Sequence, residues 1–287
     1  DSYILLGNGA IELIYKIIDS IGFYRLYAIM PTFCEYKRAA LNRDMKFYEI
    51  EVYNEEFTEF NIDRFLKEIE EKSLVVLCNP NNPTGSYINN EEMAYIAEIL
   101  RDKGCYLIID ECFIEFTEDY PASSFVDRAK DYENVIIIKA LTKYYGMPGI
   151  RLGYGITKNE GLYKKVRKNQ YPWNINTAGI IAGCTVLKDE EYIMKSRNWI
   201  KEERQFLYEG LSVVSFLKPI PSKANFHLVK IKDESLDSYR LRDALSEEGI
   251  LIRVADGFSS LDSSYFRLAV LDSKANSYLL EALKKIL

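Results

Sequence analysis

The chain has 287 residues, a net charge of −6 and no long run of Lys or Arg. This length suits one large domain with a smaller one rather than a single small core. The acidic balance disfavours nucleic acid and anionic membranes as partners, and no apolar stretch reaches the roughly 20 residues that span a bilayer. We therefore expect a small-molecule ligand, which can be anionic where its pocket is locally positive.

The cysteine and histidine content narrows the possible chemistry. Five cysteines without a C-x-x-C motif indicate a reduced, cytoplasmic protein without a disulfide framework. The single histidine, His227, excludes multi-His metal sites and disfavours Ser-His-Asp catalysis unless His227 itself serves. It lies in a strand-like alternation, which favours a structural role, and we expect no metal.

Short apolar runs alternate with helical patterns over the first part of the chain. Strands are predicted at 26–30, 74–78, 106–109 and 135–138, and helices at 11–18, 33–41 and 91–101. The strands are apolar throughout, which is typical of a parallel sheet covered on both faces. Repeated strand–helix units with right-handed crossovers predict an α/β domain.

The pattern changes after a long charged and apolar helix predicted at 189–211. Beyond it, strands are predicted at 225–231, 250–254 and 265–270, and helices at 239–248 and 275–287. We therefore predict a large α/β domain with a mostly parallel sheet over residues 1–205, followed by a smaller α+β domain over residues 206–287.

Polar residues follow two of the predicted strands, where ligands gather in open parallel sheets. Asp110 ends the strand at 106–109, where a buried carboxylate needs a cationic partner, although a helix N-cap is an alternative. Asn82 lies in the loop Asn79–Gly85, which two prolines and a glycine make rigid. The loop is either a plain turn or a rigid segment that positions a side-chain amide toward a ligand.

A reactive amine is predicted after the strand at 135–138. Lys143 is followed by two tyrosines, and Arg151 lies eight residues further along, between Ile and Leu. These neighbours indicate a packed context in which a lysine amine can become nucleophilic. Near the start, Leu6–Ala10 forms a glycine-rich turn that enters a helix and can hold a phosphate on backbone N–H groups, although a simple turn is equally compatible.

Together these segments supply an amine, a cation, a carboxylate, an amide and a helix start. A pyridoxal 5'-phosphate (PLP) site requires this set: the amine forms a Schiff base, the carboxylate keeps the pyridine nitrogen protonated, and the cation and helix start neutralise the phosphate.

These motifs, in this order and over essentially the whole chain, resemble the fold-type I PLP enzymes of the class I/II aminotransferase group. The resemblance implies that Lys143 is the Schiff-base lysine and that Asp110 partners the pyridine nitrogen. It implies further contacts to the cofactor from Asn82, Phe33, Phe113, Arg151, Thr142, Gly9, Ala10 and Ile11. It also implies that Arg267, Arg253 and Asn176 contact the substrate.

Within this group the chain is similar to the threonine-phosphate decarboxylases of cobalamin biosynthesis and to the histidinol-phosphate aminotransferases. The segments 141–149, 171–176 and 257–267 look more like the decarboxylases. Phe113 points the same way, because most of the aminotransferases carry a tyrosine there whose hydroxyl reaches the ring oxygen. We therefore expect decarboxylation of L-threonine O-3-phosphate, with transamination of histidinol phosphate or a related amino acid as the alternative, and a homodimer by resemblance.

The chain also departs from the family pattern. Ala140 stands where relatives usually place a phosphate-binding Ser or Thr, and Ala10 and Ile11 lack the polar side chains common there. Relatives carry several dozen residues before the glycine turn, so we expect part of the small domain to be missing from this chain. These departures leave a non-catalytic PLP-binding module as a further alternative.

Overall fold

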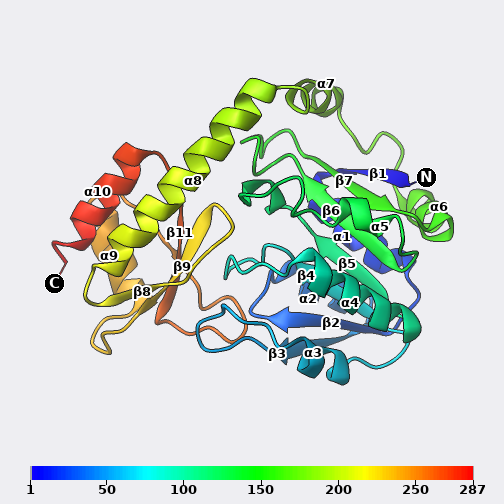
Figure 1. The fold of residues 1–287 in the computed structure, drawn as a ribbon, viewed down its shortest axis with the longest axis horizontal. Coiled ribbons are helices and arrows are strands. Elements are labelled where there is room, and N and C mark those ends of the chain that lie inside the picture. The colour runs from blue at the N-terminus through cyan, green and yellow to red at the C-terminus, as the bar shows by residue number, and fades with distance from the viewer. Residues whose placement is uncertain (1, 287) are drawn as a thin grey trace.

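The computed structural model describes residues 2–286 and shows two β-sheets connected by a long helix (Figure 1). The larger sheet has the strand order β1-β7-β6-β5-β4-β2-β3, and the smaller sheet has the order β10-β11-β9-β8. The larger sheet consists of β1 (Tyr3–Asn8), β2 (Arg25–Met30), β3 (Lys46–Glu51), β4 (Leu74–Cys78), β5 (Tyr106–Asp110), β6 (Val135–Ala140) and β7 (Leu152–Thr157). The smaller sheet consists of β8 (Leu217–Pro219), β9 (Phe226–Ile231), β10 (Arg253–Val254) and β11 (Tyr265–Ala269).

Helices cover both faces of the larger sheet, as its apolar strands predict. Apolar side chains of α1 (Gly9–Ser20), α2 (Glu35–Leu41) and α6 (Glu160–Asn169) pack on one face. Those of α3 (Ile62–Glu68), α4 (Asn90–Asp102) and α5 (Val126–Ala129) pack on the other. Successive strand residues alternate between the two cores, so every position of β4 is buried.

Strands β2 to β6 run parallel, which confirms the predicted α/β class. Strand β7 is antiparallel to both of its neighbours, β6 and β1. The sequence did not predict β1, β3 and β7 as strands, and edge strand β3 has a single buried position. Edge strand β1 is buried only at alternate positions, and β7 contains two glycines, so neither carries a continuous apolar run.

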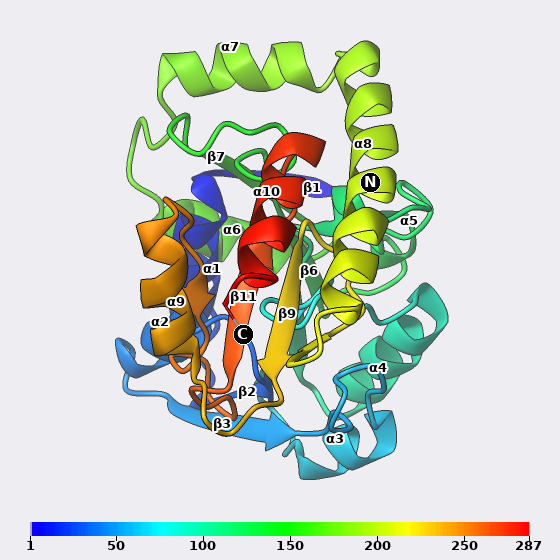
Figure 2. The same ribbon diagram turned by 90° about the vertical axis from the view of Figure 1, so that its left-hand side faces the viewer.

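The small domain is an antiparallel sheet packed against helices. Its apolar core includes side chains of α8 (Glu190–Ser212), α9 (Ser238–Glu247) and α10 (Ser273–Leu283), and it reaches the large domain at Phe113, Phe116 and Tyr144. Only two residues of the strand predicted at 250–254 pair with β11. Helix α8 runs without interruption through the predicted domain boundary at 205/206, and α7 (Thr177–Val186) lies across its beginning (Figure 2).

No helix within residues 2–286 is long and apolar enough to cross a membrane.

Candidate active site

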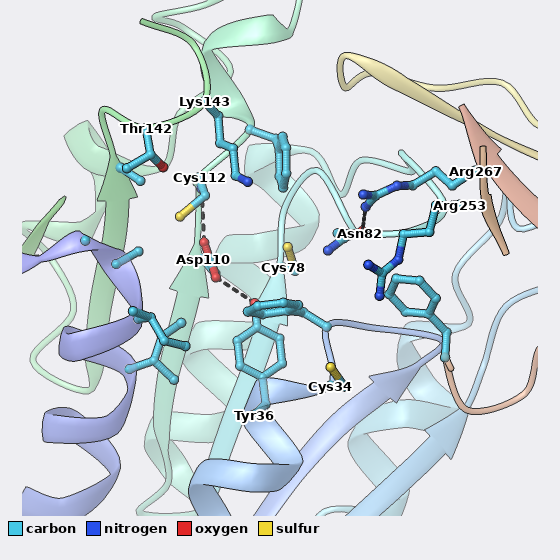
Figure 3. Close-up of a pocket in the computed structure, with 18 of the residues that line it drawn as sticks. Cys34, Tyr36, Cys78, Asn82, Asp110, Cys112, Thr142, Lys143, Arg253 and Arg267 are labelled. Carbon is cyan, nitrogen blue, oxygen red and sulfur yellow. Dashed lines mark hydrogen bonds between the residues drawn. The ribbon is translucent and has the colours of Figure 1, made fainter. Parts of the chain in front are cut away.

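A cavity of about 320 Å³ lies between the two sheets, at the carboxyl ends of β4, β5 and β6. It also faces the beginning of α1 and the strands β10 and β11 of the small domain (Figure 3). Twelve of the thirteen residues that the sequence analysis assigned to cofactor or substrate line it: Gly9, Ala10, Ile11, Phe33, Asn82, Asp110, Phe113, Thr142, Lys143, Arg151, Arg253 and Arg267. The thirteenth, Asn176, is not among the residues that line the cavity.

Lys143 lies in a turn after β6 and extends its amine into the cavity (Figure 3). Its Nζ lies 5.8 Å from the centroid of the Phe113 ring. The adjacent Tyr144 is fixed by α8, because its hydroxyl donates to the Ile193 carbonyl (2.9 Å) and its own carbonyl accepts from the Tyr192 hydroxyl (2.8 Å). The backbone that carries Lys143 is therefore held in place while its amine stays accessible.

The neighbouring Lys139 differs from Lys143 because it is buried and ion-paired. It is 2% exposed and pairs with Glu115 (2.9 Å) and Glu111 (3.5 Å). Burial alone would lower the pKa of Lys139, but the two carboxylates raise it above its ordinary value, so the amine stays protonated. Lys143 takes part in no ion pair within residues 2–286 and lines the cavity, which distinguishes it as the amine available for chemistry.

Asp110 ends β5 and is 3% exposed. Its Oδ1 accepts from the backbone N–H of Cys112 (3.0 Å), and its Oδ2 accepts from the hydroxyl of Tyr36 (2.7 Å). No Lys or Arg within residues 2–286 forms an ion pair with this carboxylate. A buried carboxylate without a cation is costly, so Asp110 fits a site that receives a protonated ring nitrogen.

The beginning of α1 forms one end of the cavity. Asn8 is the N-cap residue but makes no side-chain cap bond, and the first turn of α1 lies against the cavity through Gly9, Ala10 and Ile11. Arg151 lies beside this turn: its Nη1 donates to the Pro148 carbonyl (3.2 Å) and its Nη2 to the Asn8 carbonyl (3.5 Å). Backbone N–H groups and one guanidinium thus converge where an anionic group binds.

Glycines allow this close approach. Gly9 has φ +75°, and a Cβ there would lie 2.5 Å from Nη2 of Arg151. A Cβ on Gly153 of β7 would lie 2.5 Å from the backbone N of Ala10. Ala140 has only a methyl group as its side chain, so the donors available to an anion at this end of the cavity are backbone N–H groups, Arg151 and the Thr142 hydroxyl.

Replacing Gly9 with alanine should therefore weaken PLP binding by about tenfold, because the new methyl group displaces Arg151 and the positive φ disfavours alanine. The dissociation constant from an absorbance titration of the apoprotein measures this. Gly249→Ala is the matched control, because Gly249 has φ +72° with open space around its Cβ position. Equal PLP affinities for the two variants would contradict the assigned role of Gly9.

Asn82 and Phe33 come from loops held by buried side chains. The Asn79 side chain accepts from the Ile88 N–H (2.8 Å) and donates to the Ile88 carbonyl (2.9 Å). The Asn81 amide donates to the Pro31 carbonyl (2.8 Å). This bonding explains why the Asn-Pro-rich segment is rigid. It orients Asn82 into the cavity opposite Lys143 (Figure 3).

Two arginines of the small domain form the opposite wall. Arg253 and Arg267 are register partners on β10 and β11, and Arg267 donates to Oδ1 of Asn82. Burial, with a further contribution from Arg253, lowers the pKa of Arg267 to about 10, which leaves it charged at neutral pH. No carboxylate within residues 2–286 pairs with either guanidinium, so together they form a site for anions.

Asn176 and His227 do not line the cavity, and their side chains bond to the backbone. Asn176 caps α7: its Oδ1 accepts from the Gly179 N–H (2.7 Å), and its Nδ2 donates to the Ile150 carbonyl (3.0 Å). His227 is 1% exposed, and both ring nitrogens contact backbone carbonyls. The structure thus does not bring Asn176 to the cavity, and it gives His227 the structural environment that its strand pattern indicates.

The sequence reasoning missed Tyr36. It did not single out this helical tyrosine, although the structure places it against Asp110 and in the lining of the cavity. A tyrosine three residues after Phe33, on the buried face of a predicted helix next to the sheet, is the signal that could have indicated it.

The residues present fit PLP on observations of the structure itself. An accessible lysine, a buried carboxylate without an ion-pair partner in residues 2–286, the first turn of α1 and a nearby arginine line one cavity. Aromatic rings of Phe33 and Phe113 line the same cavity. The lysine would hold the Schiff-base carbon, the carboxylate the ring nitrogen, and the start of α1 with the arginine the phosphate. Phe33 would lie against the ring face, and Phe113 would lie near the ring oxygen.

Comparison with known proteins agrees with this geometry. The family described as "Aminotransferase class I and II" matches residues 1–283. A "Threonine-phosphate decarboxylase" of Salmonella typhimurium is 30% identical over 100% of this chain and 77% of its own length. A "Histidinol-phosphate aminotransferase" of Thermoanaerobacter sp. is 34% identical over 99% of this chain and 78% of its own.

The fold is also similar to that of a solved aminotransferase structure. The histidinol-phosphate aminotransferase from Clostridium acetobutylicum superposes with a TM-score of 0.94 and 38% identity, covering 100% of this chain and 84% of that one. Sequence, fold and site therefore agree, and the chain belongs to the class I and II aminotransferase family of PLP-dependent enzymes.

Proposed function

We propose that this enzyme decarboxylates L-threonine O-3-phosphate. The proposal rests on two guanidiniums of the small domain that form no ion pair within residues 2–286, because Arg253 and Arg267 line the same cavity as the Lys143 amine. A substrate with one amine, one carboxylate and one phosphate matches this arrangement with a partner for each group. Phe113 supports it, since a phenylalanine without a hydroxyl is the residue that resembles the decarboxylases.

The chemistry follows from what each side chain can do. PLP, when bound, supplies a ring that accepts the electron pair released from a bond at the substrate Cα. Arg253 and Arg267 bind the two anionic groups and so determine which Cα bond stands perpendicular to the ring. Asp110 keeps the ring nitrogen protonated, and the cavity walls limit the access of water.

Lys143 donates or accepts the proton at the substrate Cα. If the bond to the carboxylate breaks, CO₂ leaves, and the Lys143 amine is placed to donate a proton to Cα. If the bond to hydrogen breaks, the same amine accepts that proton, which is the first step of transamination. The orientation of the substrate on the arginine pair therefore separates the two reactions.

The second candidate is a histidinol-phosphate aminotransferase. The 38% identity and TM-score of 0.94 to the Clostridium acetobutylicum aminotransferase favour it. Its amino acceptor, 2-oxoglutarate, carries two carboxylates and also suits two arginines. The choice depends on the reaction that the enzyme performs with each substrate.

Supplying each substrate to the PLP-loaded enzyme tests the proposal. We expect L-threonine O-3-phosphate to release CO₂ and form aminopropanol phosphate. We expect histidinol phosphate with 2-oxoglutarate to form glutamate at a rate at least about 100-fold lower, because a productive orientation for one bond excludes the other. Glutamate formation without CO₂ release would replace the proposed reaction with the second candidate.

A homodimer and a cytoplasmic location belong to the same proposal. Helix α7 exposes Ile180 (50%) and Ile181 (63%), and the loop before it exposes Trp173 (96%). An apolar surface of this kind is what a second copy of the chain would cover.

A further inference from the structure

Tyr36 lies between two of the residues assigned to the cofactor. It is 0% exposed on α2, and its hydroxyl donates to Oδ2 of Asp110 at 2.7 Å (Figure 3). Its ring packs against the Phe33 ring in a T-shaped arrangement, with centroids 5.6 Å apart and planes at 87°. One side chain therefore contacts both the carboxylate assigned to the ring nitrogen and the ring assigned to the cofactor face.

The environment allows Tyr36 only one role in the hydrogen bond. Burial, and then the charge of Asp110, raise the pKa of Tyr36 well above its ordinary value, so the phenol keeps its proton. Burial and Asp110 likewise raise the pKa of the Cys78 and Cys112 thiols, which stay neutral. A protonated phenol facing a carboxylate donates, so the direction of this bond does not change with pH in the working range.

The geometry leaves Asp110 with restricted freedom. The Cys112 N–H holds Oδ1, and the Tyr36 hydroxyl holds Oδ2, so the plane of the carboxylate is fixed at two points. Each carboxylate oxygen accepts more than one hydrogen bond, which leaves capacity for a ring N–H from the cavity side. Both donors stabilise the charged form that the ring nitrogen needs.

We propose that Tyr36 is a positioning residue, which holds Asp110 against the cofactor ring nitrogen and Phe33 against the ring face. The hydroxyl acts through Asp110, and the ring acts through Phe33. This inference concerns cofactor binding, so it does not depend on whether the enzyme decarboxylates or transaminates its substrate.

Tyr36→Phe removes the hydroxyl and keeps the ring. We expect the dissociation constant for PLP to rise about tenfold, since one charge-assisted hydrogen bond to Asp110 is lost. We also expect the pH midpoint of the bound cofactor's visible absorbance to move upward, because a less firmly protonated ring nitrogen repels the proton at the Lys143 linkage less. Far-UV circular dichroism of the apoprotein should be unchanged.

Tyr27→Phe is the matched control. Tyr27 is 2% exposed and its hydroxyl also donates to a carboxylate, that of Glu70 (3.4 Å), but it does not line the cavity. This variant should bind PLP with the affinity and pH midpoint of the parent enzyme. Parental values of both quantities in Tyr36→Phe would overturn the proposal, and so would loss of the apoprotein fold, which would make Tyr36 a general structural residue.

A double-mutant cycle separates action through Asp110 from an independent effect. Asp110→Asn should weaken PLP binding on its own, and Tyr36→Phe should then add less than a twofold further loss. A full tenfold loss in both backgrounds would show that the hydroxyl does not act through Asp110. That result would overturn the positioning role of the hydroxyl even if the single variant behaves as expected.

Discussion

Lys143→Ala is expected to abolish the visible absorbance band of the bound cofactor and to reduce turnover by at least about 10³-fold. The variant loses both the amine that links to the cofactor and the group that moves the proton at Cα, and proton transfer alone contributes typically 10²–10⁴-fold. Absorbance spectra of the PLP-loaded protein and initial rates with L-threonine O-3-phosphate measure the two effects.

Lys158→Ala is the control for a simple loss of positive charge. Lys158 is exposed beyond the end of β7, and it does not line the cavity. It should keep the band and the rate of the parent enzyme. Persistence of the band in Lys143→Ala would refute the Schiff-base role of Lys143, and a retained rate would refute its role in proton transfer.

Arg267→Met should lower kcat/KM for the phosphorylated amino acid by roughly 10²-fold or more. Truncating one partner of a buried charge pair costs about 2–5 kcal/mol, and Arg267 is the more buried of the two cavity arginines. The affinity for PLP should change far less, because within residues 2–286 the Arg267 guanidinium hydrogen-bonds to Asn82 alone among the residues assigned to the cofactor. Steady-state kinetics and a PLP titration measure the two quantities separately.

Two further variants give this experiment its controls. Arg267→Lys keeps the positive charge but loses the planar guanidinium group. Its kcat/KM should therefore lie between the values of the parent enzyme and of Arg267→Met. Arg242→Met removes an arginine of α9 that pairs with Asp243 and does not line the cavity, so its kinetics should match the parent. Unchanged kcat/KM in Arg267→Met would show that the substrate's anionic groups bind elsewhere.

The residues that follow the parallel strands were predictable from the sequence. Asp110 and Lys143 come after continuous apolar runs, and Asn82 lies in a loop with two prolines, so their meeting at one edge of the sheet follows from the topology. The family resemblance added Arg253 and Arg267, and the structure brings both to the same cavity.

Other features depend on packing that a single sequence does not display. The contact of Tyr36 with Asp110 joins residues 74 positions apart and requires α2 to pack against the sheet. The antiparallel strands β1 and β7 lack the continuous apolar pattern because one is a half-exposed edge and the other contains glycines. For Asn176, the local signal of an N-cap residue three positions before Gly179 was available and indicated the capping role that the structure shows.

The domain boundary remains a prediction. The change in pattern near residue 205 precedes the antiparallel strands β8 to β11, but α8 continues to Ser212 and packs against both parts of the molecule. When one helix packs against two apolar cores, its sequence carries no local signal at the point where the first core ends.

The arrangement of the cavity walls has a consequence for how such enzymes diversify. Asp110 ends β5 of the large sheet, and Asn82 and Lys143 lie in segments that follow β4 and β6, whereas Arg253 and Arg267 come from neighbouring strands of the small sheet. Mutations in the small sheet can change which molecule is held, and at what angle, without altering the residues assigned to the cofactor. A lineage can in this way exchange one reaction for another while its cofactor chemistry is inherited intact, which is consistent with relatives of similar identity carrying the names of two different reactions.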